Sequence, residues 1–242
     1  MEKRDILLSE RMQMVADMVT KGNVAADIGC DHGFVSIYLA EQGICPRVIA
    51  MDVNEGPLLR AKEHVAERGL ESLISIRLSD GIDKLLEKEA DSVFIAGMGG
   101  RLVIKILSDH FDKVRGLKEI ILQPQSELHL VRKFLSTEGM TIVQEDMVEE
   151  AGKFYPCMKA VWKEQSVKYT ELEEWYGPLL LEKKHPVLHR FLRKEKIMFE
   201  QIAEEIRNNA KGGVTEEEKA ENIKKRIGQI NEALSYFEKQ EG

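Results

Sequence analysis

The sequence is poor in cysteine and lacks the long apolar runs of membrane proteins. Its three cysteines are Cys30, Cys45 and Cys157, and none forms a CxxC pair. A sparse, odd number of cysteines is atypical of disulfide-stabilised secreted domains and fits a reducing compartment. No segment reaches the roughly 18 consecutive apolar residues of a membrane span, and the charged first residues are unlike a signal peptide. We therefore expect a cytoplasmic protein that does not enter the membrane.

Basic residues are also in the minority. The chain has 35 lysines and arginines against 42 aspartates and glutamates, so its formal net charge is −7. This excess of acid argues against a generally basic nucleic-acid coat protein, but a local basic patch stays compatible with it, because binding follows the local field. The chain has 242 residues, 43% of them hydrophobic, which is enough to bury a full core.

Short apolar segments alternate with amphipathic ones along most of the chain. The expected strands cover residues 24–28, 47–52, 73–78, 93–96 and 120–122, and the expected helices include residues 5–21, 56–68 and 127–138. Strands that alternate with helices predict an α/β fold with a parallel sheet covered on both faces. Two further strands, residues 141–149 and 153–163, are joined only by a short turn and must pair antiparallel. This is the Rossmann-like layout of class I methyltransferases, whereas a plain dinucleotide-binding domain would keep a helix at that place.

The composition changes near residue 166. Apolar residues then recur at helical spacing in two stretches, Leu188, Leu192, Phe199, Ile202 and Ile206, followed by Ile223, Ile227, Ile230, Leu234 and Phe237. The alternating steps of four and three in the second stretch are those of a paired-helix seam. We predict a methyltransferase domain over residues 1–164 and an antiparallel, coiled-coil-like helical hairpin over residues 165–242, with solvated charged outer faces.

The first motif, Asp27-Ile28-Gly29-Cys30-Asp31-His32-Gly33, follows the first expected strand. Glycine there allows close backbone approach to a ligand, the next helix points its N-terminus at that ligand, and ligands of open α/β sheets bind beyond the carboxyl ends of strands. The spacing GxxxG is not the GxGxxG of dinucleotide sites. The acid two residues before Gly29 suits the ammonium group of S-adenosylmethionine. The alternative is an ordinary strand-to-helix turn.

Two more acids end the next two strands. Asp52 is placed to accept both hydroxyls of a ribose, and Asp80, which precedes Gly81, could accept from the amino group of an adenine. Each of these acids alone also fits a turn or a helix cap. Three acids at three successive strand ends favour a site for S-adenosylmethionine.

The fourth strand ends in Gly97-Met98-Gly99-Gly100. The Asn/Asp-Pro-Pro-aromatic motif of enzymes that methylate exocyclic amino groups is absent here, as is the Pro-Cys pair of cytosine-C5 enzymes. The glycines predict close backbone approach by the cofactor or a flat group, or else a tight loop. A ring nitrogen such as N1 of adenine fits these absences, because its lone pair can attack the sulfonium methyl group once both are oriented and water is excluded.

Together with Leu122-Gln123-Pro124-Gln125 and Gly152-Lys153-Phe154-Tyr155, these motifs resemble the bacterial tRNA (adenine-22-N1)-methyltransferase family, the TrmK type. The resemblance runs from about Leu7 to Trp162, and the helical hairpin agrees with it. It implies methyl transfer from S-adenosylmethionine to N1 of an adenine in the D-arm region of tRNA. One departure is Phe34-Val35-Ser36, where the family often has an aromatic residue and then Leu-Pro.

The resemblance also implies site residues. The cofactor would be held by Asp27, Gly29, Cys30, Asp31, His32, Gly33, Asp52, Val53, Asn54, Asp80, Gly81, Gly97, Met98 and Gly99. The candidate tRNA contacts are Lys3, Arg4, Arg11, Gly99, Gly100, Arg101, Lys105, Gln123, Pro124 and Tyr155. Each cation among them also fits an ordinary surface residue, and Tyr155 fits core packing as well as base stacking. Asp31 and His32 are the candidate catalytic residues, either as proton-handling groups or as residues that order the loop. No metal is expected, and a monomer is favoured.

Two other functions stay open. One is an S-adenosylmethionine-dependent methyltransferase of another RNA, a small molecule or a protein, which the helical hairpin disfavours because a small substrate needs no outer arm. The other is a non-enzymatic RNA-binding or assembly protein with a degenerate cofactor pocket. The acids Asp27, Asp52 and Asp80 disfavour it, because a decayed pocket need not retain all three.

Overall fold

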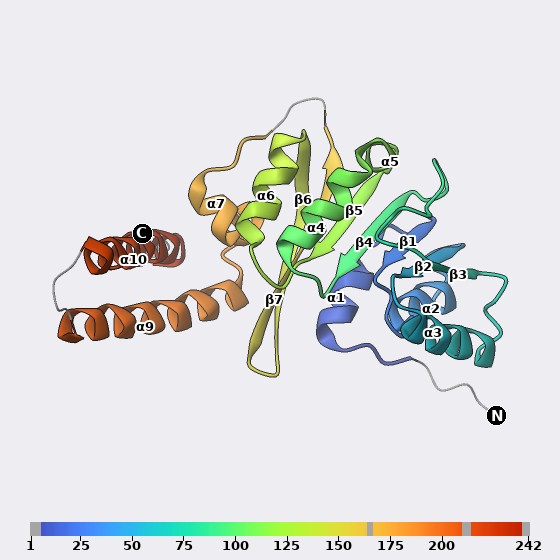
Figure 1. Ribbon diagram of the computed structural model, residues 1–242, viewed down its shortest axis with the longest axis horizontal. Helices are drawn as coiled ribbons and strands as arrows, with labels where there is room; N and C mark the ends of the chain where they lie inside the picture. Colours follow the sequence, from blue (N-terminus) through green and yellow to red (C-terminus); the bar gives the residue numbers. More distant parts are fainter. Residues whose placement is uncertain (1–5, 164–166, 210–213, 239–242) are drawn as a thin grey trace. The chain divides into compact units, whose positions relative to one another are not determined.

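The computed structural model describes residues 6–163, 167–209 and 214–238 (Figure 1). The chain divides into two compact units, residues 1–169 and 170–242. The predicted boundary between residues 164 and 165 lies outside the described residues. At the end of the first unit, the backbone N–H of Ile142 donates a hydrogen bond of 2.8 Å to the hydroxyl of Tyr169, which ties this segment to the sheet.

The first unit is built on a seven-stranded sheet with the strand order β3-β2-β1-β4-β5-β7-β6. The strands are β1 (Ala25–Ile28), β2 (Val48–Asp52), β3 (Ile74–Leu78), β4 (Ser92–Ala96), β5 (Glu119–Gln123), β6 (Met140–Glu150) and β7 (Lys153–Trp162). Strands β1 to β5 run parallel, and β7 pairs antiparallel with both β5 and β6. The predicted parallel sheet closed by an antiparallel hairpin is confirmed.

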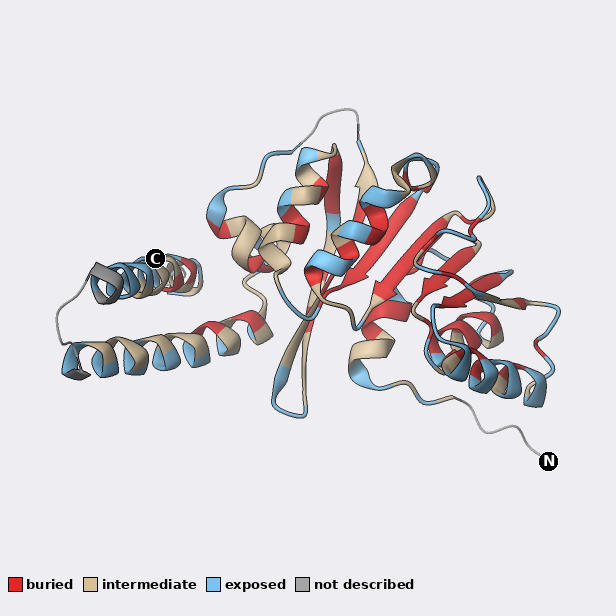
Figure 2. Cartoon of the chain, in the orientation of Figure 1, coloured by how far each residue is buried: buried red, intermediate tan, exposed pale blue. Residues whose placement is uncertain are grey.

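Six helices of the described residues accompany this sheet. They are α1 (Glu10–Met18), α2 (Phe34–Glu41), α3 (Glu55–Glu67), α4 (Gly100–Asp109), α5 (Phe111–Arg115) and α6 (Leu128–Thr137). Helix α4 packs beside α6, and α1 beside α2; Figure 1 shows α4 and α6 in front of the strands. Strands β1, β2 and β5 are buried along their whole length (Figure 2), which explains why they read as continuous apolar runs and do not alternate.

The first helix is shorter than predicted. It was expected over residues 5–21, but α1 begins at Glu10 and ends at Met18. Leu7, which seemed to extend the apolar periodicity, lies before the helix and is 94% exposed. Val19 has extended backbone angles, with φ −71° and ψ 127°, and so ends the helix before Gly22. The short helix α5 was not predicted.

The second unit consists of α7 (Glu171–Tyr176), α8 (Pro178–Glu182), α9 (Pro186–Asn209) and α10 (Val214–Glu238). The rings of His189, near the start of α9, and Phe237, near the end of α10, stack with their centroids 4.7 Å apart. The two long helices therefore run antiparallel, as predicted. Their seam is fully buried at this end, at Leu188, Leu192 and Ile230.

Helix α7 packs against α10 through a buried cation. The guanidinium of Arg226 lies 3.8 Å from the ring centroid of Trp175 and donates a 2.9 Å hydrogen bond to Glu195. Because the side chains of both charged partners are nearly buried, at 12% and 10% exposure, loss of one partner would leave the other charge uncompensated.

In the part of the chain that the structure describes, no helix combines the length and the apolar character needed to cross a membrane.

Candidate active site

A cavity of about 660 Å³ opens at the carboxyl ends of the parallel strands. Its volume is in the range of small-molecule sites. It is lined by residues from the loops that follow all five parallel strands and from the helices beside them: Arg11, Met12, Asp27–His32, Phe34, Val35, Asp52–Asn54, Pro57, Ser79–Gly81, Phe94, Ala96–Met98, Leu102, Ile106 and Gln125. The cavity therefore brings together the motifs that the sequence places at successive strand ends.

Asp27 supplies a buried acid to this cavity. It is the third residue of β1, it is 5% exposed, and its carboxylate accepts a 2.6 Å hydrogen bond from Ser36 Oγ. Burial raises the pKa of Asp27 to about 7; the hydrogen bond from Ser36 lowers it, while the charges of Asp52 and Asp31 raise it. A cation bound beside Asp27 would favour the ionised carboxylate, so this residue suits an ammonium group.

The glycine loop is fixed against β2. The backbone N–H groups of Gly29 and Cys30 both donate to the carbonyl of Met51, at 2.8 and 2.9 Å. Gly29 has φ +75°, and a Cβ placed on it would overlap the side chain of Met98. Glycine at position 29 thus serves a left-handed turn and a close approach between the loops after β1 and β4.

Asp52 ends β2 and orders the loops on both sides of it. Its carboxylate accepts from the backbone N–H of Asn54 at 2.9 Å and from that of Asp31 at 3.3 Å. It also lines the cavity and is 9% exposed. A carboxylate has about four lone-pair sites, so Asp52 can still accept from a pair of hydroxyl groups.

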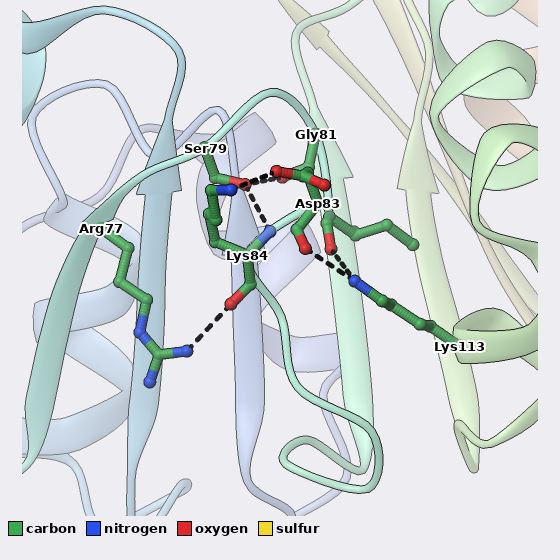
Figure 3. A network of polar contacts seen from close by, with 7 residues as sticks. Arg77, Ser79, Gly81, Asp83, Lys84 and Lys113 are labelled. Atoms are coloured by element: carbon green, nitrogen blue, oxygen red, sulfur yellow. Dashed lines mark hydrogen bonds and ion pairs between the residues drawn. The ribbon is translucent and has the colours of Figure 1, made fainter.

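The loop after β3 is a turn held by hydrogen bonds of Ser79, Lys84 and Lys113 (Figure 3). Ser79 Oγ donates to the carbonyl of Gly81 at 3.0 Å and accepts from the backbone N–H of Lys84 at 3.0 Å. Lys113 Nζ donates to the carbonyl of Asp83 at 2.6 Å. The exposed Asp80 lines the cavity, held between these two anchors.

The loops after β4 and β5 are joined by backbone hydrogen bonds. Gly97 N–H donates to the carbonyl of Gln123 at 3.1 Å, and Gln125 N–H donates to the carbonyl of Met98 at 2.9 Å. Gly97 and Met98 line the cavity. The two loops therefore form one rigid edge of the site.

Gly100, an expected substrate contact, does not line the cavity. Gly100 is buried, and a Cβ on it would lie 2.5 Å from the carbonyl oxygen of Ser126 and 2.9 Å from that of Glu127. The backbone that approaches this glycine is the protein's own loop, and no ligand is needed to explain it. Gly99, next to it, would bring a Cβ to 3.2 Å from Ser126 Oγ and is likewise not a cavity-lining residue.

Gln123 and Pro124, which are also expected substrate contacts, do not line the cavity either. Gln123 is 0% exposed, and its side-chain carbonyl accepts from Gly97 N–H at 3.2 Å; Pro124 is buried. The residue of this motif that lines the cavity is Gln125, which the sequence reasoning missed. The sequence did offer a signal for Gln125. The buried strand ends at Gln123, and Gln125 is the first polar residue beyond it, where a side chain can reach a ligand.

The predicted basic contacts lie on two surfaces and are engaged within the protein. Arg11 lines the cavity, with its guanidinium 5.3 Å from the Tyr155 ring centroid and its Nε 3.6 Å from Glu150. Arg101 pairs with Glu127 and Lys105 with Asp109. Lys3 and Arg4 lie outside the described residues.

Three rings form a stack that the sequence did not predict, and two of them, His32 and Phe34, line the cavity. The Phe34 ring stacks on His64 at 4.9 Å and on His32 at 5.8 Å between centroids. The Nε2 atom of His32 lies 3.5 Å from the Asp31 carboxylate. His64 comes from α3, and no motif pointed to it.

The remaining predicted cofactor contacts are Gly33, Cys30, Val53 and Asn54. Gly33 does not line the cavity, and a Cβ on it would lie 3.2 Å from the Cβ of Ala61. Cys30 lines the cavity, and burial together with the charges of Asp27 and Asp52 raises its pKa, so it is a neutral thiol. Val53 and Asn54 line the cavity beside Asp52, and Val53 is 60% exposed. Within the described ranges, no three His, Cys, Asp or Glu residues cluster as a metal site would require.

Comparisons with known proteins agree with this geometry. A family model described as "Methyltransferase domain" matches residues 8–158. The tRNA (adenine(22)-N(1))-methyltransferase of Bacillus subtilis is 36% identical over 194 residues, which cover 78% of this chain and 80% of that protein.

Solved structures match both units of the chain. An uncharacterized protein of Listeria monocytogenes superposes with a TM-score of 0.91 and 29% identity, covering 94% of this chain and 100% of that one. A putative tRNA (m1A22) methyltransferase of Streptococcus pneumoniae, in complex with S-adenosyl-L-methionine, superposes with a TM-score of 0.84 and 31% identity over 94% of this chain and 100% of that one. The chain belongs to the bacterial tRNA (adenine-22-N1)-methyltransferase family, which uses S-adenosylmethionine as its methyl donor.

Proposed function

We propose that this protein transfers the methyl group of S-adenosylmethionine to N1 of adenine 22 in tRNA, in the cytoplasm. The observation that carries the proposal is the convergence of Asp27, Asp52 and Asp80, from three successive strand ends, on one cavity. Family membership and 36% identity to a protein named for this reaction support it. A degenerate pocket would not need this convergence.

The fit of the cavity to the cofactor rests on its acids and its glycine turn. Asp27, whose pKa is raised to about 7, is proposed to meet the ammonium group, which would stabilise its charged form. Asp52 is proposed to accept from the ribose hydroxyls, and Asp80 from the adenine amino group. The loop with Gly29 lets the backbone approach the methionine part.

When bound, S-adenosylmethionine supplies a methyl group on a positively charged sulfur. The lone pair of adenine N1 forms the new N–C bond as the C–S bond breaks, and the electron pair of that bond stays on sulfur. The product base is cationic, and its amino group can lose a proton to water. The protein's contribution is orientation and exclusion of water, and the aromatic stack of His32, Phe34 and His64 is suited to cover the cavity.

The tRNA backbone is proposed to follow a basic groove between α4 and α6. The groove, of about 460 Å³, is lined by three cations, Arg101, Lys105 and Lys133, by one acid, Glu138, and by Ile104, Leu130, Phe134 and Thr137. Arg101 directly follows Gly100, so the groove begins beside the loop that borders the cavity. Exchange of the partners Glu127 and Asp109 for phosphates would release these cations to the RNA.

The experiment that tests this function uses unmodified tRNA, donor labelled in the methyl group, and digestion of the product to nucleosides. We expect label in 1-methyladenosine and none when adenine 22 is replaced by guanine. Label in N6-methyladenosine, or no label in tRNA while the protein binds S-adenosylmethionine in calorimetry, would favour a different acceptor. Absence of S-adenosylmethionine binding would leave only a non-enzymatic role.

A further inference from the structure

We infer that Gln125 recognises the target adenine through its N6 amino group and N7, and so leaves N1 free to accept the methyl group. This inference rests on the proposed function and assigns it a specificity-determining residue. It starts from the finding that Gln125, and not Gln123, reaches the cavity. Gln123 is 0% exposed and already bonded to Gly97, whereas Gln125 is exposed.

The backbone of Gln125 is held in place, which a base-reading residue requires. Its N–H donates to the carbonyl of Met98 at 2.9 Å, and one residue further Ser126 accepts from Gly100 N–H at 3.1 Å. The amide nitrogen of its side chain lies over Gly97, 3.6 Å from the point where a Cβ would stand. In the part of the chain that the structure describes, the Gln125 side chain makes no hydrogen bond. A fixed backbone thus carries an amide with both of its polar atoms available.

The position of Gln125 along the sheet matches that of the acceptor. The strand order β3-β2-β1-β4-β5 puts Asp80, which follows β3, and Asp52, which ends β2, toward one end of the cavity, and Gln125, which follows β5, toward the other. If the adenosine part of the donor occupies the end with the two acids, the methyl group points toward β4 and β5. A base that approaches the methyl group from that side comes beside Gln125.

The chemistry of the reaction restricts how this adenine can be recognised. N1 must face the methyl group, so no protein donor can occupy it. The edge that stays available carries the N6 amino donor and the N7 acceptor, and a carboxamide matches this pair with one acceptor and one donor. Guanine has an acceptor, O6, in place of the N6 amino group. The side-chain carbonyl oxygen of Gln125 would then face O6, which is a second acceptor. Among the residues that line this end of the cavity, Gly97, Met98 and Leu102 offer no comparable pair of side-chain groups.

The test combines variants of the protein with one altered base. The substrates are tRNA with adenine or 7-deazaadenine at position 22, where the second base lacks the N7 acceptor but retains N1 and the amino group. The proteins are the wild type, Gln125→Ala, Gln125→Glu and, as a matched exposed amide at the far end of α2, Gln42→Ala. The readouts are kcat/KM for each tRNA and Kd for S-adenosylmethionine.

We expect the wild type and Gln42→Ala to lose about tenfold in kcat/KM on 7-deazaadenine. Gln125→Ala should be slow on both substrates and nearly insensitive to the loss of N7, with an unchanged Kd for the donor. Gln125→Glu keeps an acceptor for the amino group but turns its second carboxylate oxygen, another acceptor, toward N7, so its kcat/KM should not fall, and should rise, when 7-deazaadenine replaces adenine. A Gln125→Ala protein with the full wild-type sensitivity overturns the inference alone. A wild type that binds the donor and leaves adenine 22 unmethylated overturns the proposed function, and the inference with it.

Discussion

Ser36, in the first turn of α2, donates a 2.6 Å hydrogen bond to the Asp27 carboxylate in β1. Both side chains are buried. The bond stabilises the ionised form of a carboxyl group whose pKa burial raises to about 7.

Binding of S-adenosylmethionine should depend on pH through Asp27. The free protein holds a proton on Asp27 below a pKa of about 7, and a bound ammonium group favours the ionised form, so affinity should rise as the pH increases toward 7. We expect a roughly tenfold tighter Kd at pH 7 than at pH 5.5, measured by calorimetry. Asp27→Asn should bind weakly and show no such dependence. A wild-type Kd that does not change over this pH range would show that Asp27 does not interact with the ammonium group.

Removal of the Ser36 hydroxyl should shift this pH profile. Because the hydrogen bond lowers the Asp27 pKa, Ser36→Ala should raise it and move the rise in affinity to higher pH. At pH 8 the variant and the wild type should then differ less than at pH 6. Thermal unfolding of Ser36→Ala serves as the control, since a loss of affinity caused by misfolding would not depend on pH in this way.

Asp52 should contribute strongly to cofactor affinity. Hydrogen bonds to a charged group stabilise by about 1.5–3 kcal/mol each, so Asp52→Ala should weaken binding of S-adenosylmethionine by at least tenfold. Asp112→Ala, an exposed acid on α5, is the control and should bind normally. A change of less than twofold in the Asp52→Ala protein would contradict the placement of the ribose.

Gly29→Ala should reduce both stability and cofactor binding. Gly29 and Gly152 share φ +75°, but only the Cβ at position 29 would overlap another side chain, that of Met98. Gly152→Ala therefore measures the backbone cost alone, about 1–2 kcal/mol, and should leave binding intact. Gly29→Ala should unfold at lower denaturant, and addition of Met98→Ala should recover part of the difference. Equal unfolding midpoints for Gly29→Ala and Gly152→Ala would argue against a role for the Met98 contact.

Gly100→Ala should destabilise the protein more than its place in a helix suggests. The Cβ would stand 2.5 Å from a backbone carbonyl oxygen that belongs to the loop after β5, and overpacking of this kind costs about 1–3 kcal/mol. Gly56→Ala, in the first turn of α3 with nothing within 4 Å of its Cβ, should be neutral or stabilising. Chemical denaturation of the two variants checks the contrast.

Lys105 and Lys133 should affect tRNA and not the cofactor. If both contact phosphates, Lys105→Ala and Lys133→Ala should each weaken tRNA binding and reduce the salt slope by about one. Lys62→Ala, an exposed lysine on α3, is the control. A salt slope unchanged in both variants would place the tRNA backbone on another surface.

The sequence by itself determined the order of the elements and the acids that end the strands. Strands β1, β2 and β5 are buried along their whole length. Their sequences are therefore mostly apolar and can be recognised without knowing which elements cover them. The residue that follows such a run lies at the ligand-binding edge of the sheet. For this reason Asp27, Asp52 and Asp80 could be placed in one site without knowledge of any contact.

Only the tertiary structure decided what depends on contacts between distant segments. The glycine at position 100 accommodates the backbone of residues 126 and 127. Arg11 of α1 contacts Tyr155 of β7, and the second glutamine of the Gln-Pro-Gln segment lines the cavity. A local sequence pattern cannot show whether a glycine leaves room for a ligand or for another segment of the same chain. It also cannot show which of two nearby glutamine side chains is buried. Those differences arise when loops after β4 and β5 bond to each other, a pairing that the sequence does not encode locally.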